Sequence, residues 1–200
     1  EGDSEGAWQS YLAYFIDPDK PHGLEDAFLR EILDLLSGMG GIPELSYPSH
    51  TSGRFIEVKT EYQSSGDRPD VLILNEGSWY VCAELKVGAK ENKTGRGWQT
   101  ERYAKNDEIV PSGVDEYEQG AYVYIAPADS RDSRSDEFVD IWWRDISERV
   151  RSFLSKNATK VPGRTASQLD DFASTIENET AMTEIDSPTK EKKELYFEYY

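Results

Sequence analysis

RPDVLIL at residues 68–74 and WYVCAELK at residues 79–86 are two apolar runs separated by a short turn. Runs of this length that are bounded by turn residues predict the two strands of a β-hairpin. Asp70 opens the first strand, and Glu84 and Lys86 close the second, so the hairpin brings the three side chains together. Because side chains alternate between the two faces of a strand, Glu84 and Lys86 point to the same side.

Two carboxylates and one ammonium on otherwise apolar strands are costly to bury unless they are paired or hold a metal ion. Mg²⁺ suits such a site, because it binds through few carboxylates and keeps several water molecules. A metal bound in this way activates water near neutral pH and neutralises charge on a phosphate, and a lysine beside it adds a compact positive charge. The alternative is an ordinary hairpin on which Glu84 and Lys86 form a salt bridge on a solvated face.

This pattern resembles the PD-(D/E)xK nuclease superfamily, whose members have the restriction-endonuclease-like fold. The residues that carry the resemblance lie between residue 24 and about residue 150: Glu25, Pro69, Asp70, Glu84, Leu85, Lys86, Gln99 and Tyr103. The resemblance implies an α/β fold with a mixed β-sheet flanked by α-helices. It also implies a phosphodiester hydrolase that depends on Mg²⁺ or Mn²⁺.

The resemblance assigns a role to each of these residues. Lys86 orients or activates the attacking water. Gln99 and Tyr103, which are four residues apart and therefore on one face of a helix, hold water or phosphate. The implied metal ligands are Glu25, Asp70, Glu84 and the main-chain carbonyl of Leu85.

For the residues outside the hairpin, an ordinary structural role is the alternative. Glu25 falls in the first turn of a predicted helix, where a carboxylate is favoured by the helix dipole. Gln99 and Tyr103 also fit a surface helix with an exposed glutamine and a half-buried tyrosine.

The chain carries a net charge of −17, which is opposite in sign to the usual charge of nucleic-acid enzymes. Residues 86–105 run against this trend, with six basic residues and two acidic ones. We therefore expect nucleic acid, in the first place DNA, to bind through this segment. The basic residues concerned are Lys86, Lys90, Lys93, Arg96, Arg102 and Lys105. The acidic excess elsewhere suits solubility and a high-salt cytoplasm.

The 200 residues are enough for one compact domain. We expect an aromatic-rich N-terminal leader at 1–23, a nuclease-like core at 24–156 and a C-terminal helical extension at 157–200 that packs on the core. The aromatic end of the chain, residues 195–200, either docks on the core or contacts a partner or a second copy. Hydrophobic patterning predicts strands at 54–62, 69–74, 79–87, 120–126 and 138–143, and helices at 24–37, 98–106, 145–155 and 168–176.

Several classes of protein are disfavoured. No apolar stretch has the length of a membrane span. Cys82 is the only cysteine, which excludes an internal disulfide and a cysteine-ligated iron–sulfur cluster and favours a reducing cytoplasm. His22 and His50 lack a second ligand at zinc spacing, and the glycines at 38–41 lack the lysine of a phosphate-binding loop.

Two functions remain from the sequence. The first is a Mg²⁺-dependent nuclease that acts in repair, recombination or defence. The second is a catalytically inactive protein of the same fold that acts as a protein-binding module, through its acidic surface and aromatic end.

Overall fold

The computed structural model describes residues 2–45, 47, 56–63, 66–75, 77–88, 91–106, 109, 117–128 and 133–186, with 2–5 and 181–186 as backbone only. The helices among them are α1 (Gly2–Ile16), α2 (Ala27–Ser37), α3 (Gln99–Ala104), α4 (Trp143–Lys156) and α5 (Gly163–Asp186). The strands are β1 (Ile56–Thr60), β2 (Val71–Asn75), β3 (Trp79–Leu85), β4 (Lys93–Thr94), β5 (Gly97–Trp98), β6 (Gln119–Ala126) and β7 (Phe138–Trp142).

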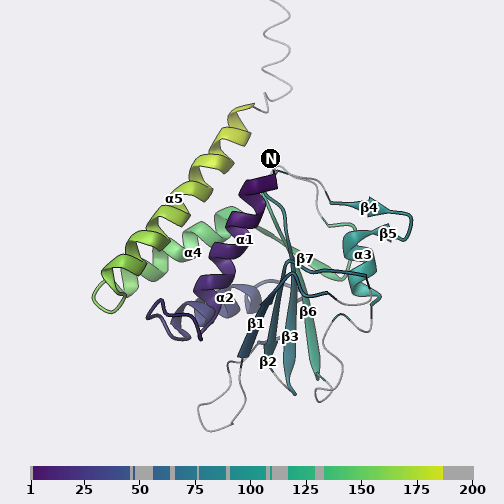
Figure 1. Ribbon diagram of the computed structural model, residues 1–200, viewed down its shortest axis with the longest axis horizontal. Helices are drawn as coiled ribbons and strands as arrows, with labels where there is room; N and C mark the ends of the chain where they lie inside the picture. The colour runs from purple at the N-terminus through teal and green to yellow at the C-terminus, as the bar shows by residue number, and fades with distance from the viewer. Residues whose placement is uncertain are drawn as a thin grey trace, which may run out of the picture.

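Five of the strands form one mixed sheet in the order β1-β2-β3-β6-β7. β1, β2 and β3 are antiparallel neighbours, whereas β6 and β7 run parallel to β3. The predicted hairpin is therefore present as β2–β3 in the middle of the sheet. Helices flank this sheet (Figure 1), which confirms the predicted α/β class.

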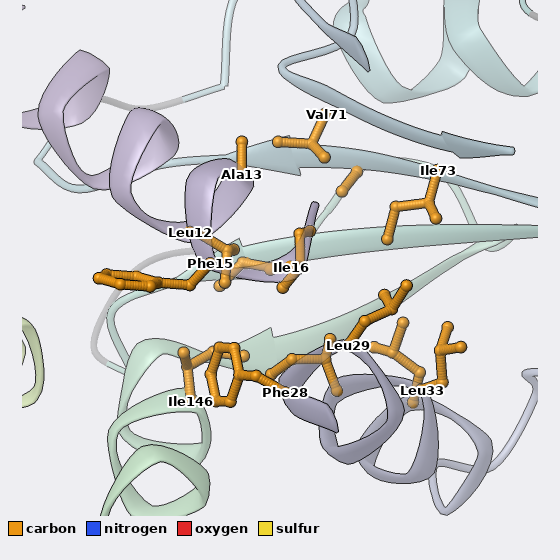
Figure 2. Packing of buried hydrophobic residues seen from close by; sticks show 14 of the residues in the cluster. Leu12, Ala13, Phe15, Ile16, Phe28, Leu29, Leu33, Val71, Ile73 and Ile146 are labelled. Carbon is orange, nitrogen blue, oxygen red and sulfur yellow. The ribbon is translucent and has the colours of Figure 1, made fainter. Parts of the chain in front are cut away.

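The two faces of the sheet are covered differently. Helices α1, α2, α4 and α5 lie on one side, and the short helix α3 and the β4–β5 hairpin lie on the other (Figure 1). On the first side, Figure 2 shows Ala13 of α1 next to Val71 of β2, and Phe28 of α2 next to Ile146 of α4, all in one buried cluster. The second face carries a smaller apolar cluster that includes Leu72, Cys82, Tyr103 and Tyr124.

The alternation of side chains along each strand explains this division. Val71, Ile73 and Leu85 are buried under the helices of the first face, while Leu72 and Leu74 are buried on the second. Central strands that are buried on both faces read as continuous apolar runs. This is why β2 carries the uninterrupted sequence VLIL before Asn75.

Of the four predicted helices, α2 and α5 differ by more than two residues at one end or both, whereas α3 and α4 differ by one or two. α2 begins at Ala27 and not at Leu24, because Glu25 adopts a left-handed backbone with φ 51° in the turn before it. α5 is much longer than the predicted 168–176, although its buried residues Leu169, Phe172, Ala173 and Ile176 are those that the pattern indicated. Its polar outer turns are tied to α4, where Arg151 donates hydrogen bonds to Ser174 and Glu177.

His22 is a structural residue of the α1–α2 loop and not a metal ligand. Its Nδ1 accepts a hydrogen bond from Leu24 N (3.0 Å), so its Nε2 carries the proton and donates to the Asp17 carbonyl (2.9 Å). Thr165 Oγ1 of α5 donates to the His22 carbonyl (2.6 Å), and the ring meets Tyr14 edge to face. His50 and the aromatic residues 195–200 lie outside the described residues.

None of the helices in the described parts of the chain is both long and apolar enough to cross a membrane.

Candidate active site

The register of the β2–β3 hairpin brings Asp70 and Glu84 face to face. Val71 pairs with Ala83, so Asp70, one residue before β2, lies opposite Glu84. Directly opposite residues of antiparallel strands project on the same side of the sheet. Oδ2 of the Asp70 carboxylate also accepts a hydrogen bond from Leu85 N (2.7 Å), which holds the carboxylate against the end of β3.

Lys86 completes this cluster on the second face of the sheet. Its ammonium donates a hydrogen bond to Glu84 Oε1, and the two residues are 3% and 0% exposed. The main chain of Lys86 is held from both sides, because its N donates to Ile125 O (2.8 Å) and its carbonyl accepts from Trp143 Nε1 (2.6 Å). The salt bridge of the alternative is therefore present, but its placement on a solvated face is wrong.

The burial of this ion pair argues for a chemical role. Moving two charges out of water costs several kcal/mol per ion, roughly, and an apolar pair of similar volume is often as stable. A second carboxylate, Asp70, beside the Glu84–Lys86 pair adds like-charge repulsion. An arrangement that works against folding stability at a strand end is typical of a functional site.

Helix α3 holds Gln99 and Tyr103 over the end of β2. Gln99 Nε2 donates to the Tyr103 hydroxyl (2.8 Å), which donates in turn to the Arg68 carbonyl (2.7 Å). Tyr103 is fully buried, and burial, followed by the charges of Glu84 and Asp70, raises the pKa of its phenol. The phenol therefore remains a protonated donor. Within the described part of the chain, the buried Gln99 Oε1 has no hydrogen-bond partner.

Three further residues support the site and were not singled out from the sequence. Tyr124 of β6 lies beside Glu84 in the register; burial raises the pKa of its phenol, and nearby Lys86 opposes this. The period-2 pattern of the segment GAYVYIA could have placed Tyr124 on the face of Glu84. Gln9 of α1, which is buried, donates through Nε2 to the Asp70 carbonyl (2.7 Å), and no local pattern signals that contact.

The third residue is Asp67, which ties the start of the site strand to α3. Its carboxylate accepts hydrogen bonds from Arg102 Nε (2.9 Å) and Asn106 Nδ2 (3.2 Å), and Arg96 lies 3.4 Å away. Arg102 is thus largely buried, with a side-chain exposure of 13%, whereas that of Arg96 is 57%. Of the basic residues expected to meet nucleic acid, Lys86 lies inside the site, Lys93 and Lys105 are exposed, and Lys90 lies outside the described residues.

Glu25 is placed apart from this cluster. It is exposed in the turn before α2, and α2 packs on the opposite face of the sheet from α3. Among the residues that the structure describes, no three His, Cys, Asp or Glu side chains form a group that could hold a metal. The structure thus brings Asp70, Glu84 and Lys86 together with Gln99 and Tyr103, but not with Glu25.

The donor chemistry of the cluster fits a divalent cation with few protein ligands. Asp70 and Glu84 offer hard carboxylate oxygens from opposite register positions on one face. Leu85, the last residue of β3, lies next to these two carboxylates, because its main-chain N donates a hydrogen bond to Asp70. Mg²⁺ and Mn²⁺ accept oxygen ligands and commonly complete their shells with water, so two carboxylates are sufficient.

Cys82 lies on the same face but is chemically quiet. Burial raises the pKa of its thiol well above the ordinary value, and the charges of Glu84 and Asp70 raise it further. A thiol that stays protonated is a poor nucleophile and a poor metal ligand.

The mixed sheet, the Asp70 and Glu84-x-Lys86 hairpin and the following Gln99–Tyr103 helix define one class of protein. A family model described as the PD-(D/E)XK nuclease superfamily matches residues 2–200, and the chain belongs to that superfamily. The match includes α1 and α5 as well as the sheet. Nuclease activity and the use of divalent metals are typical of this superfamily. No curated protein and no solved structure matches the chain significantly.

Proposed function

We propose that the protein is a divalent-metal-dependent nuclease that hydrolyses phosphodiester bonds of nucleic acid, with DNA as the first substrate to test. The observation that carries this proposal is the buried Glu84–Lys86 ion pair, with the partly exposed Asp70 on the same face at the end of the central hairpin. The family match supports a nuclease. Repair, recombination or defence in the cytoplasm is the setting that we propose for this activity.

Asp70 and Glu84, with the Leu85 carbonyl, would hold Mg²⁺ or Mn²⁺. A cation held there would supply activation of water and neutralisation of charge on the phosphate. Lys86 provides a positive charge that is fixed by Glu84 and by the hydrogen bonds to its main chain, and it orients the attacking water.

Gln99 and Tyr103 have complementary tasks in this proposal. Tyr103 keeps its proton and fastens α3 to Arg68, two residues before Asp70. The amide nitrogen of Gln99 donates to Tyr103. The buried Oε1 of Gln99 is then available to accept a hydrogen bond from a water molecule in the site. Positioning of this kind lowers the barrier by fixing the geometry of the reactants before reaction.

The test is cleavage of end-labelled single- and double-stranded DNA in Mg²⁺ or Mn²⁺, at low and high salt, by the unchanged chain and by Lys86→Met. Methionine approximates the length of lysine, but it leaves the buried Glu84 carboxylate without its partner, so the variant is expected to be less stable and its folding has to be measured. We expect cleavage that needs the metal, is abolished by EDTA and falls by about 10³-fold in the variant. Lys160→Ala, in an exposed turn after α4, is the matched control and should cleave normally.

Circular dichroism and urea unfolding show whether each variant is folded. An absence of cleavage by the folded, unchanged chain under every salt and metal condition would contradict the proposal. That result would favour the protein-binding module instead. Equal cleavage by Lys86→Met would place the chemistry elsewhere.

A further inference from the structure

The β4–β5 hairpin carries a tryptophan next to the candidate active site. Lys93 pairs with Trp98 and Thr94 with Gly97, and Trp98 is followed directly by Gln99, the first residue of α3. In Figure 1 the hairpin lies beside α3, on the side of the sheet that carries the site. In the sequence, Trp98 is therefore the direct neighbour of Gln99, whose side chain belongs to the candidate site.

The Trp98 ring has two cationic neighbours. Lys93 Nζ is 5.1 Å from the ring centroid, and Arg134 Cζ is 4.9 Å from it. Both cationic residues are exposed, and Trp98 is partly exposed. Within the described residues, Trp98 belongs to neither of the two apolar clusters, so packing of the core does not account for it.

The segments around the ring are fixed to one another. Glu91 accepts hydrogen bonds from Thr100 N (2.7 Å) and from Arg134 N (3.2 Å), which joins the hairpin, α3 and the segment before β7. On the other side, Arg102 donates both to the Gly97 carbonyl (3.2 Å) and to Asp67. The main chain on either side of Trp98 is thus tied to Asp67, three residues before Asp70.

An aromatic ring flanked by cations is the combination that binds single-stranded nucleic acid. Bases stack on the ring, and the cations neutralise the phosphates on either side. Every base has a π-face, but in a duplex that face is covered by its neighbours except at an end. A cation at an exposed ring is held weakly, so Lys93 and Arg134 can leave the indole for phosphate oxygens when a base arrives.

We propose that Trp98 stacks an unpaired base of a nucleic-acid strand whose neighbouring phosphate enters the site, so that single-stranded segments are the preferred substrate. This inference rests on the proposed nuclease function and narrows its substrate class. The base replaces Lys93 or Arg134 on the ring, and the displaced cation neutralises the adjacent phosphate. The acidic charge elsewhere opposes non-specific binding of any nucleic acid, so the contacts at Trp98 carry more of the binding.

The test is binding, measured without cleavage. A fluorescein-labelled strand of about twelve nucleotides and its duplex are titrated with the whole chain in EDTA, followed by anisotropy. Trp98→Ala should weaken binding of the single strand by about tenfold and that of the duplex by less than about twofold, while Trp98→Phe should stay close to the unchanged chain. Tyr11→Ala, an exposed aromatic on α1, is the control and should change nothing.

A scan with a single abasic position separates stacking from a merely structural role. With the unchanged chain, one position of the strand should lose affinity when its base is removed, and with Trp98→Ala no position should. The scan is run on DNA and on RNA of the same sequence, and a position-specific loss in either polymer supports the proposal. Equal weakening of strand and duplex by Trp98→Ala, or a flat scan with the unchanged chain, would overturn it.

The two proposals can fail separately. A position-specific loss in a chain that does not cleave DNA or RNA keeps the stacking platform and removes the nuclease. Cleavage with a flat scan keeps the nuclease and removes the platform.

Discussion

The two faces of the central sheet differ in what they bury. The first face, under α1, α2, α4 and α5, buries apolar side chains such as Leu29 and Ile125. The second face buries Glu84 and Lys86 beside a small apolar cluster, under the short helix α3. Because side chains alternate along a strand, neighbouring residues such as Glu84 and Leu85 point to opposite faces of the sheet. The apolar core that stabilises the fold and the polar candidate site therefore lie on different faces.

This comparison suggests how the site is tolerated. A buried ion pair with a second carboxylate costs free energy, and the large apolar face offsets that cost. The main chain of the site is also held from the first face, through Trp143 to the Lys86 carbonyl and through Gln9 to the Asp70 carbonyl. We therefore expect changes on the first face to affect stability and changes on the second to affect activity.

The largest effect should follow from Asp70→Asn. Asparagine keeps an oxygen that accepts from Leu85 N but removes the charge that a metal needs. Cleavage should fall by about 10³-fold or more, which corresponds to roughly 4 kcal/mol in the barrier. Without metal the free energy of unfolding should be unchanged or higher, because a repulsion with Glu84 is lost. Steady-state cleavage and urea unfolding measure the two effects, and a variant that cleaves normally would contradict this assignment.

A pair of leucines tests the division between the faces directly. Leu29 and Leu72 are both fully buried, the first in α2 and the second in β2 under the site face. Each change to alanine should lower the free energy of unfolding by about 2–5 kcal/mol. Only Leu72→Ala should also lower the activity per folded molecule, because Leu72 is two residues from Asp70. Equal activity losses in the two variants would mean that the faces are not independent.

Alkaline pH should weaken the second face more than the first. Burial raises the pKa of Tyr103, Tyr122 and Tyr124, all of which lie on or against the second face. A raised pKa in the folded state means that the stabilisation is fully present below the unfolded value of about 10 and is lost as the pH rises from there towards the folded value. Each such tyrosine contributes a slope of about 1.4 kcal/mol per pH unit in that window.

Tyr124→Phe checks this expectation with little change in volume. Its free energy of unfolding should fall less steeply with pH above about 10 than that of the unchanged chain. Tyr11→Phe, which removes an exposed phenol on α1, is measured beside it to control for the loss of a hydroxyl. Identical slopes for the Tyr124 variant and the unchanged chain would contradict the role of burial.

The sequence predicted the sheet and the central cluster because both depend on local patterns. Apolar runs marked β2 and β3, and alternation placed Glu84 and Lys86 on one side, opposite to Leu85. The two-residue strands β4 and β5 were missed, since a glycine- and lysine-rich segment has no period to detect. The roles of Gln9 and Asp67 depend on contacts with residues far along the chain, which no local pattern contains.

Glu25 and α5 are two places where a prediction from the local pattern was wrong or incomplete. The helical pattern placed Glu25 inside a helix, but the chain turns there with a positive φ, and the side chain stays exposed away from the site. Buried residues of α5 end at Ile176 among those whose side chains are described, but the helix continues to Asp186, so an apolar pattern alone does not mark its end. Glu177, directly after Ile176, accepts hydrogen bonds from Arg151 of α4, a contact that no local pattern contains.

The smallest effect should come from the pairing of Arg151 with Glu177, which lies on the partly exposed surface of α4 and α5. The hydrogen bond to Arg151 lowers the pKa of Glu177, so its stabilisation is present above the unfolded pKa and is lost as the pH falls through the folded one. Glu177→Gln should cost only about 0.2–1 kcal/mol at neutral pH, because both side chains are partly exposed and Asp170 remains as a partner. Urea unfolding at low and high salt measures it, and the cost should shrink in high salt as screening weakens the pair. A loss of cleavage activity in this variant would show that α5 is coupled to the site, which the separation of the two faces argues against.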